Sequence, residues 1–249
     1  MCTLTFVPKP VGYILGMNRD ESVLRPAALP PTRFIQSGVE AVYPRESATG
    51  GTWVAANSDG IAFALLNQNR GPGSGPKLRS RGNLIPALVH GRNMRAAIVK
   101  LEQMDLNGLF PFLLTGFFPA EKTILEWKWN GKELTGRPLN WGSRHWFSSG
   151  ISDAMAAQVR GAFCTSAWQR RDAGSAEWLR RMHASHSPVR GSFSVCVHRP
   201  EAATVSYTEL SYDGEQVELR YHVGQPCQAL GRFDHELTLA NRRYFAAAS

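Results

Sequence analysis

The chain has 249 residues, of which 43% are hydrophobic and 19% charged, so it can form a folded core and lacks the composition of a disordered chain. No apolar run approaches the roughly 20 residues that span a bilayer, and the start lacks the features of a secretory signal, so we expect a cytoplasmic protein. The net charge of +8 comes from dispersed basic residues without a nucleic-acid-binding motif. These features predict a basic surface or, second, an anionic-ligand site, and exclude nucleic acid as an expected partner.

The first half of the chain reads as strands followed by a helical region. The Asp-Gly pair at 59–60 is typical of a tight hairpin turn, and the later apolar residues have helical spacing. The expected elements are paired strands at 2–7 and 13–17, a proline-rich surface loop at 23–41, a hairpin of 52–56 and 61–66, a glycine- and proline-rich loop at 71–82, and a helical region at 83–104 broken near Gly91.

The second half alternates strands, helices and strands. Its expected elements are a hairpin of 124–129 and 132–135, helices at 152–163 and 173–184, and strands at 192–198, 205–212 and 217–222. Because hairpins join most of the strands, antiparallel sheets are favoured over a parallel one. The chain is therefore expected to be a single α+β domain over residues 1–249, since no repeat or long linker divides it.

The cysteines and histidines give no metal pattern along the chain. The four cysteines are scattered without a CxxC pair, and Cys164 and Cys196 lie among small and apolar residues typical of a buried core. His183 and His186 are three residues apart on an expected helix, without a cysteine or acidic residue beside them. We interpret them as surface histidines and expect neither a metal nor a cofactor.

Cys2 is the first candidate for chemistry. Removal of the initiator Met1 would leave a thiol and a free α-amine on one residue, with ordinary pKa values of about 8.5 and roughly 7.7–8.0. The amine can accept the thiol proton and return it to a leaving group, so one residue supplies nucleophile and base. The alternative is that Cys2 merely begins a strand.

Polar residues in 16–21 form the second candidate group. They follow the apolar part of a strand that should bring them beside the chain start. A cation there would lower a thiol pKa, and a carboxylate would hold the ammonium group. Asn18 and Asp20 should share a strand face, with Arg19 opposite. The alternative is a polar loop after an edge strand.

Asn67 is the third candidate. It ends an apolar strand, where its amide could donate to a developing oxyanion, a contribution of about 3–4 kcal/mol in acyl-transfer sites. The alternative is an asparagine in a turn, and Asn69 competes for the same role.

These positions belong to motifs that resemble the NRDE family (transport and Golgi organization 2-like). The motifs are Met-Cys-Thr at the start, Asn18-Arg19-Asp20-Glu21, Arg25-Pro26, Tyr43-Pro44-Arg45-Glu46, Gly50-Gly51-Thr52-Trp53 and Asn57-Ser58-Asp59-Gly60. The family in turn resembles the choloylglycine hydrolase and penicillin V acylase group. That resemblance implies a four-layer αββα sandwich of antiparallel sheets, the N-terminal-nucleophile hydrolase fold, with a catalytic N-terminal cysteine.

The same resemblance implies roles for individual residues. Asp20 would bind the α-amine, Asn67 would form the oxyanion hole, and Asn18 matches a group asparagine; the group's arginine is displaced by two positions, so Arg19 would replace it. Two further hydrolase positions imply substrate-binding residues: an asparagine that falls near Ser148 and Ser149, and a final arginine close to Arg190.

Two functions stay open at this point. The first is an amidohydrolase or acyltransferase that acts on a small amide through a Cys2 thioester. The second is a non-catalytic intracellular carrier of haem or an acyl-lipid on the same fold, related to trafficking. The serines at 148–149 and the displaced arginine favour the second.

Overall fold

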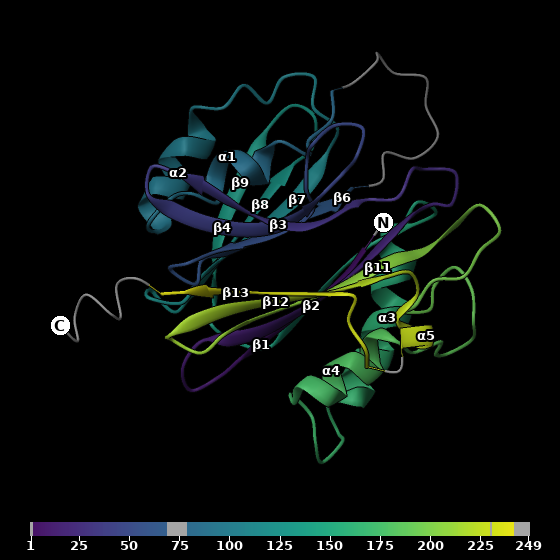
Figure 1. Cartoon of the computed structure of the whole chain (residues 1–249). Coiled ribbons are helices and arrows are strands. Elements are labelled where there is room, and N and C mark those ends of the chain that lie inside the picture. The colour runs from purple at the N-terminus through teal and green to yellow at the C-terminus, as the bar shows by residue number, and fades with distance from the viewer. Residues whose placement is uncertain (1, 69–78, 230, 242–249) are drawn as a thin grey trace.

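The structure, a computed structural model, describes residues 2–68, 79–229 and 231–241. Two antiparallel sheets dominate it (Figure 1). The first sheet has the strand order β10-β1-β2-β11-β12-β13, and the second has the order β3-β4-β5-β6-β7-β8-β9. The strands of the first sheet are β1 (Cys2–Pro8), β2 (Tyr13–Ser22), β10 (Arg144–Ser148), β11 (Ala202–Tyr212), β12 (Gln216–Val223) and β13 (His235–Ala240). Those of the second are β3 (Leu29–Gln36), β4 (Val39–Arg45), β5 (Val54–Asn57), β6 (Ala62–Asn67), β7 (Phe112–Phe118), β8 (Thr123–Trp129) and β9 (Leu134–Asn140).

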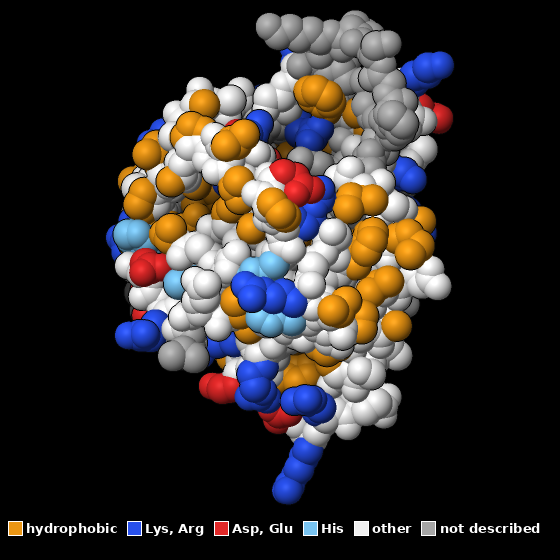
Figure 2. Space-filling view, turned by 90° about the vertical axis from the view of Figure 1, so that its right-hand side faces the viewer, with side chains coloured by type: hydrophobic (Ala, Val, Ile, Leu, Met, Phe, Trp, Pro, Cys, Tyr) orange, Lys and Arg blue, Asp and Glu red, His pale blue; other side chains and the backbone are white. Residues whose placement is uncertain are grey.

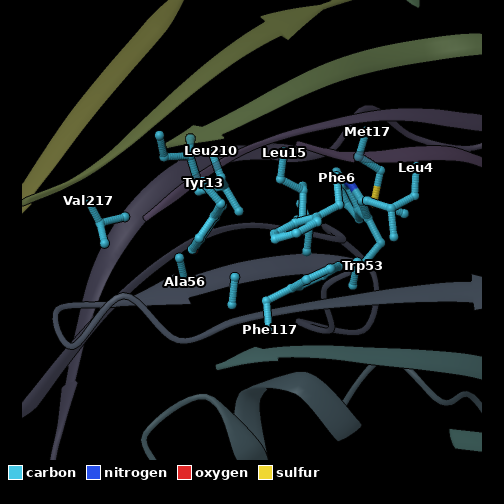
Figure 3. Packing of buried hydrophobic residues seen from close by; sticks show 14 of the residues in the cluster. Leu4, Phe6, Tyr13, Leu15, Met17, Trp53, Ala56, Phe117, Leu210 and Val217 are labelled. Carbon is cyan, nitrogen blue, oxygen red and sulfur yellow. The ribbon is translucent and has the colours of Figure 1, made fainter. Parts of the chain in front are cut away.

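Helices cover the outer faces of both sheets. They are α1 (Leu84–Leu88) and α2 (Met94–Glu102) on the second sheet, and α3 (Asp153–Ala167), α4 (Ala176–His183) and α5 (Pro226–Ala229) on the side of the first. Apolar residues fill three interfaces: one between the sheets, where Leu4, Phe6, Trp53 and Phe117 meet (Figure 3), and one under each helical layer. The αββα sandwich expected from the sequence is confirmed.

Strand pairing places Cys2 at one end of the first sheet. β1 lies between β10 and β2, and the antiparallel register sets Cys2 opposite Ser148 on one side and Arg19 on the other. Side chains alternate along β1, so Cys2 and Leu4 face the second sheet while Thr3 and Thr5 face the helices. The apolar alternation of this strand therefore anchors Cys2 at the rim of the inter-sheet core.

Three sequence expectations differ from the structure. β2 continues to Ser22, so residues 18–21 are part of a strand rather than of a loop after it. Residues 23–41 include β3 and the start of β4; the prolines in β3 are tolerated because β3 is an edge strand with an irregular register between Leu29 and Thr32. Residues 192–198 do not form the expected strand; within this range His198 makes a single antiparallel bridge to Ala203.

Other expected elements are confirmed. The hairpin of β5 and β6 turns at Gly60, whose φ of 79° favours glycine, and Asn57 Oδ1 accepts from the amides of Asp59 and Ile61. The helical region breaks between α1 and α2, and α3 and α4 are capped by Ser152 and Ser175. The loop expected at 71–82 lies largely outside the described residues. None of the described helices is long and apolar enough to cross a membrane.

Candidate active site

A cavity of about 370 Å³ opens beside Cys2, at the end of the sandwich where β1 begins. Residues from five of the sequence motifs line it, and they come from both sheets. From the first sheet come Cys2, Arg19, Asp20 and Glu21, followed by Arg25, and from the second sheet and its loops come Glu46, Thr52, Trp53, Leu65, Asn67, Ser80, Arg81, Gly82 and Phe110. Motifs that are far apart in the sequence thus meet at one hollow.

Cys2 is held firmly at the floor of this cavity. Its backbone nitrogen donates to Ser148 Oγ at 2.9 Å, and its side chain is buried. Burial raises the pKa of the Cys2 thiol; the Asp20 carboxylate acts in the same direction, whereas the backbone amide of Asp20 and the Arg19 guanidinium lower it. A reactive thiolate here therefore depends on a nearby proton acceptor.

Arg19 lies on the cavity side of β2, opposite Cys2, as the strand alternation predicts. Its guanidinium stacks over Trp53 at 4.3 Å and pairs with Glu46 at 2.8 Å and with Glu21 at 3.5 Å. Arg25 pairs with the same two carboxylates, at 2.8 and 3.0 Å. The wall next to the thiol is thus a network of alternating charges.

Asp20 is buried beside Cys2, in contact with two residues that the sequence did not single out. Its Oδ1 accepts from the Thr204 hydroxyl at 2.6 Å, and its Oδ2 lies 3.5 Å from the Arg160 guanidinium. Burial raises the pKa of the Asp20 carboxyl, and Arg160 and Thr204 act in the opposite direction. Arg160 also donates to Thr3 Oγ1 at 2.9 Å and to the carbonyl oxygen of Cys2 at 3.4 Å.

Asn67 borders the cavity from the end of β6. Its Oδ1 accepts from Arg81 Nε at 2.8 Å, which fixes the orientation of the amide. Burial lowers the pKa of Arg81 to about 10, so the side chain remains cationic at neutral pH. The segment that carries Arg81 approaches Gly51 closely: the Gly82 carbonyl accepts from the Thr52 amide at 3.0 Å, and a Cβ on Gly51 would lie 2.6 Å from Gly82 Cα.

Asn18 faces the helices and does not line the cavity. It starts a buried chain of hydrogen bonds: its Oδ1 accepts from His183 Nδ1 at 3.1 Å, so His183 Nε2 accepts from the Thr5 hydroxyl at 3.1 Å. His145 Nδ1 then donates to Thr5 Oγ1 at 2.9 Å, and Trp168 Nε1 donates to His145 Nε2 at 2.8 Å. Every group in this chain is satisfied only when both imidazoles are neutral. His183 is therefore a core residue, and its expected place on the surface is wrong.

None of the three predicted substrate-binding residues lines the cavity. Ser148 instead contacts the Cys2 nitrogen. Ser149 accepts from the amides of Ile151 and Ser152 and so shapes the turn before α3. Arg190 is exposed and contacts His198 Nδ1 at 3.1 Å, while Arg160 occupies the buried position beside Asp20.

Sequence reasoning missed Arg160, Arg81 and the roles of Glu21 and Glu46. Glu21, Glu46 and Trp53 belong to the motifs that resemble the family, so membership of those motifs was the signal that could have identified them. Arg160 had none, because its acidic partner Asp20 is 140 positions away in the chain and on another element.

Comparison with known structures identifies the class of fold. An N-acylethanolamine-hydrolyzing acid amidase ortholog of Caenorhabditis elegans matches with a TM-score of 0.59 at 10% identity, covering 84% of this chain and 92% of that one. A mutant and a variant of the conjugated bile acid hydrolase from Clostridium perfringens match with TM-scores of 0.55 and 0.56 at 10% and 11% identity. They cover 96% and 98% of this chain and 93% of each of theirs. The chain therefore has the N-terminal-nucleophile hydrolase fold.

The family follows from the sequence. The family model described as Transport and Golgi organisation 2 matches residues 1–131, more than half of the chain. The chain belongs to this family, and the resemblance of its motifs is confirmed. No curated protein sequence matches it.

Proposed function

We propose that the chain is an amide-bond hydrolase or acyltransferase of the N-terminal-nucleophile type, acting on a small amide through a thioester on Cys2. The observation that carries the proposal is the cavity in which Cys2, Asp20 and Asn67 meet, at the end of a fold shared with an acid amidase and a bile acid hydrolase. Its lining carries charges of both signs, which suits a small polar substrate.

The chemistry starts from Cys2 after removal of Met1. The thiol passes its proton to its own α-amine as the sulfur attacks the amide carbonyl carbon, and Asn67 donates to the oxyanion. The carbon–nitrogen bond then breaks, the ammonium returns the proton to the leaving amine, and a thioester remains. Water attacks the thioester carbonyl, its proton returns through the amine to the sulfur, and a carboxylic acid leaves; an acceptor amine in place of water gives acyl transfer.

Neighbouring residues would hold the new amine in place. Ser148 Oγ already accepts from the Cys2 nitrogen at 2.9 Å. Asp20 supplies a buried carboxylate close by, because it follows Arg19, the residue that pairs with Cys2 across the strands. Arg19 would stabilise the thiolate, since it faces Cys2 across the strand pair and lowers the thiol pKa. Glu46 limits this effect because it pairs with the same guanidinium.

One observation favours the carrier of haem or an acyl-lipid as a second candidate. The Cys2 thiol is buried and its pKa is raised, which disfavours a spontaneous thiolate. The charged network of Arg19, Glu21, Arg25 and Glu46 weighs against an acyl-lipid, whose tail needs an apolar lining.

Intact-mass analysis and acyl labelling test the proposal. We expect a protein that lacks Met1 and forms a covalent thioester with a small activated acyl probe, located by peptide mapping at Cys2 and released by hydroxylamine. Cys2→Ala should abolish the adduct. In protein treated with a chelator to remove any bound metal, Cys227, the one half-buried cysteine among the described residues, is an internal control for thiols that react through exposure alone.

Two results would overturn the proposal. One is a protein that retains Met1 in the cell that produces it. The other is a processed protein in which Cys2 reacts no faster than Cys227, together with stoichiometric binding of haem or an acyl-lipid that Cys2→Ala leaves unchanged; this would establish the carrier.

A further inference from the structure

Four potential metal ligands converge on the other side of the first sheet, away from the Cys2 cavity. His186, Cys196 and His198 lie in the irregular segment between α4 and β11, and Cys227 lies in the short helix α5. One side-chain atom from each, two imidazole nitrogens and two sulfurs, lies within 4.8 Å of every other. Figure 2 shows histidine side chains on either side of a basic side chain near the middle of one face.

The spacing of these atoms fits a tetrahedral zinc ion. Zinc–nitrogen bonds of about 2.0–2.1 Å and zinc–sulfur bonds of about 2.3 Å place neighbouring ligands roughly 3.3 Å apart for two nitrogens and roughly 3.6 Å apart for nitrogen and sulfur. His186 Nε2 lies 3.0 Å from His198 Nε2. The Cys196 and Cys227 sulfurs lie 3.6 and 3.5 Å from that same nitrogen of His198.

We propose that His186, Cys196, His198 and Cys227 form a structural zinc site. Two neutral imidazoles and two thiolates are a common ligand set for tetrahedral zinc, and four protein ligands close the coordination sphere, so no position is left for a substrate. Binding displaces the two thiol protons, and the two thiolate charges neutralise the ion. The site could not be recognised in the sequence, because the ligands are spread over 42 positions without a CxxC pair.

Zinc binding by His198 requires Arg190 to move. Its guanidinium donates to His198 Nδ1 at 3.1 Å, which assigns the proton of a neutral imidazole to Nε2. Coordination through Nε2 moves that proton to Nδ1, so Arg190 has to swing away. It can do so because it is exposed. Loss of Arg190 should consequently leave zinc binding unchanged or make it tighter.

The site has a mechanical connection to the Cys2 cavity. Between the ligands Cys196 and His198, the backbone amide of Val197 donates to Thr204 Oγ1 at 2.8 Å, and Thr204 in turn donates to Asp20 Oδ1. Zinc would therefore fix the segment that holds Thr204 against Asp20, and it would also tie α5 to this segment. The proposal does not depend on chemistry at Cys2.

Metal titration of the full-length protein tests this site. Reduced protein, stripped with a chelator, should bind one equivalent of Co²⁺ with the visible bands of a tetrahedral ion and a thiolate charge-transfer band, and Zn²⁺ should displace it. Cys227→Ser and His186→Gln should each weaken metal binding more than about 100-fold. This exceeds the loss expected when a residue that only hydrogen-bonds to a metal ligand is removed. Cys164→Ala and His222→Gln, a cysteine and a histidine outside the cluster, should bind as the wild type does.

Further readouts separate loss of metal from loss of fold. Zn²⁺ should raise the Tm of the stripped wild type and of Arg190→Ala, but not of Cys227→Ser, whose circular dichroism should remain native. Octahedral Co²⁺ spectra, equal affinity in Cys227→Ser, or weakening of more than about tenfold in Arg190→Ala would each overturn the proposal. A Cys196–Cys227 disulfide in protein prepared without an oxidant, seen as a mass lower by two hydrogens, would also refute it.

Discussion

Lowering the pH should destabilise the protein through the buried hydrogen-bond chain of Asn18, His183, Thr5 and His145. Burial lowers the pKa of His183 to about 3 and that of His145 to about 4. In the unfolded chain, both imidazoles titrate near their ordinary pKa of about 6.5. Between these values the unfolded state binds protons that the folded state rejects, so stability falls as the pH is lowered from about 6.5 towards 4.

The size of the effect follows from the two pKa differences. At pH 5 each unfolded imidazole is protonated, which lowers the free energy of unfolding by about 2 kcal/mol per histidine relative to pH 7. Together, His183 and His145 should remove about 4 kcal/mol. This is a large part of the stability of an ordinary domain, so the protein should approach unfolding in weak acid.

Urea denaturation at pH 7 and pH 5, followed by circular dichroism, measures the difference. His145→Gln should reduce the gap between the two pH values by about 2 kcal/mol, whatever its effect at pH 7. In nuclear magnetic resonance spectra, the ring protons of His183 should not titrate above pH 5. A difference below about 1 kcal/mol between the unfolding free energies at pH 7 and pH 5 would refute the inference that both imidazoles are neutral in the folded protein. A His183 ring that titrates near its ordinary pKa would refute it as well.

Three further predictions concern the cavity. Arg160→Met should cost about 3–5 kcal/mol of unfolding free energy in urea denaturation, because it leaves the Asp20 carboxylate buried without its cation. Gly51→Ala should destabilise the protein by about 1–3 kcal/mol in the same assay, since the added methyl group meets backbone at 2.6 Å. Ser148→Ala should slow acyl labelling of Cys2 about fivefold, the effect of losing one hydrogen bond of about 1 kcal/mol to the amine.

Matched substitutions serve as controls for the first two of these predictions. Arg95→Met, at an exposed arginine of α2, should change stability by less than about 0.5 kcal/mol. Gly142→Ala adds a methyl group where no atom beyond the two neighbouring residues lies within 4 Å, and it should be equally mild. A full labelling rate in Ser148→Ala, or a loss in Arg160→Met no larger than that in Arg95→Met, would contradict the arrangement around Cys2.

The position of Cys2 relative to Arg19 could be predicted because local sequence determines it. A short turn joins β1 and β2, so their pairing needs no long-range information, and the alternation of apolar residues assigns Arg19 to the face of Cys2. The hairpin that ends in Asn67 has an equally local signal at Gly60. The fold class and four of the residues that line the cavity, Cys2, Arg19, Asp20 and Asn67, could therefore be predicted from the sequence.

The other contacts around the cavity depend on the pairing of elements that are far apart in the chain, and no local sequence pattern indicates such pairing. Arg160 lies in a helix of small residues, where an arginine normally faces solvent, and only the docking of α3 on β10 turns it towards Asp20. The extension of β2 through residues 18–22 depends on β11, which pairs with it along its whole length. Tertiary pairing overrode the polar composition that indicated a loop.

The anchoring of Cys2 also constrains when the chain can be processed. First residues of a domain usually fray, but here Ser148 holds the Cys2 nitrogen, Arg160 holds its carbonyl, and only 5% of the residue is exposed. The bond to be cleaved ends at this enclosed nitrogen, so we expect the removal of Met1 that the proposed chemistry requires to occur during translation, before β1 is enclosed between β2 and β10. β10 is synthesised more than 130 residues later, which leaves a wide interval for that cleavage during translation.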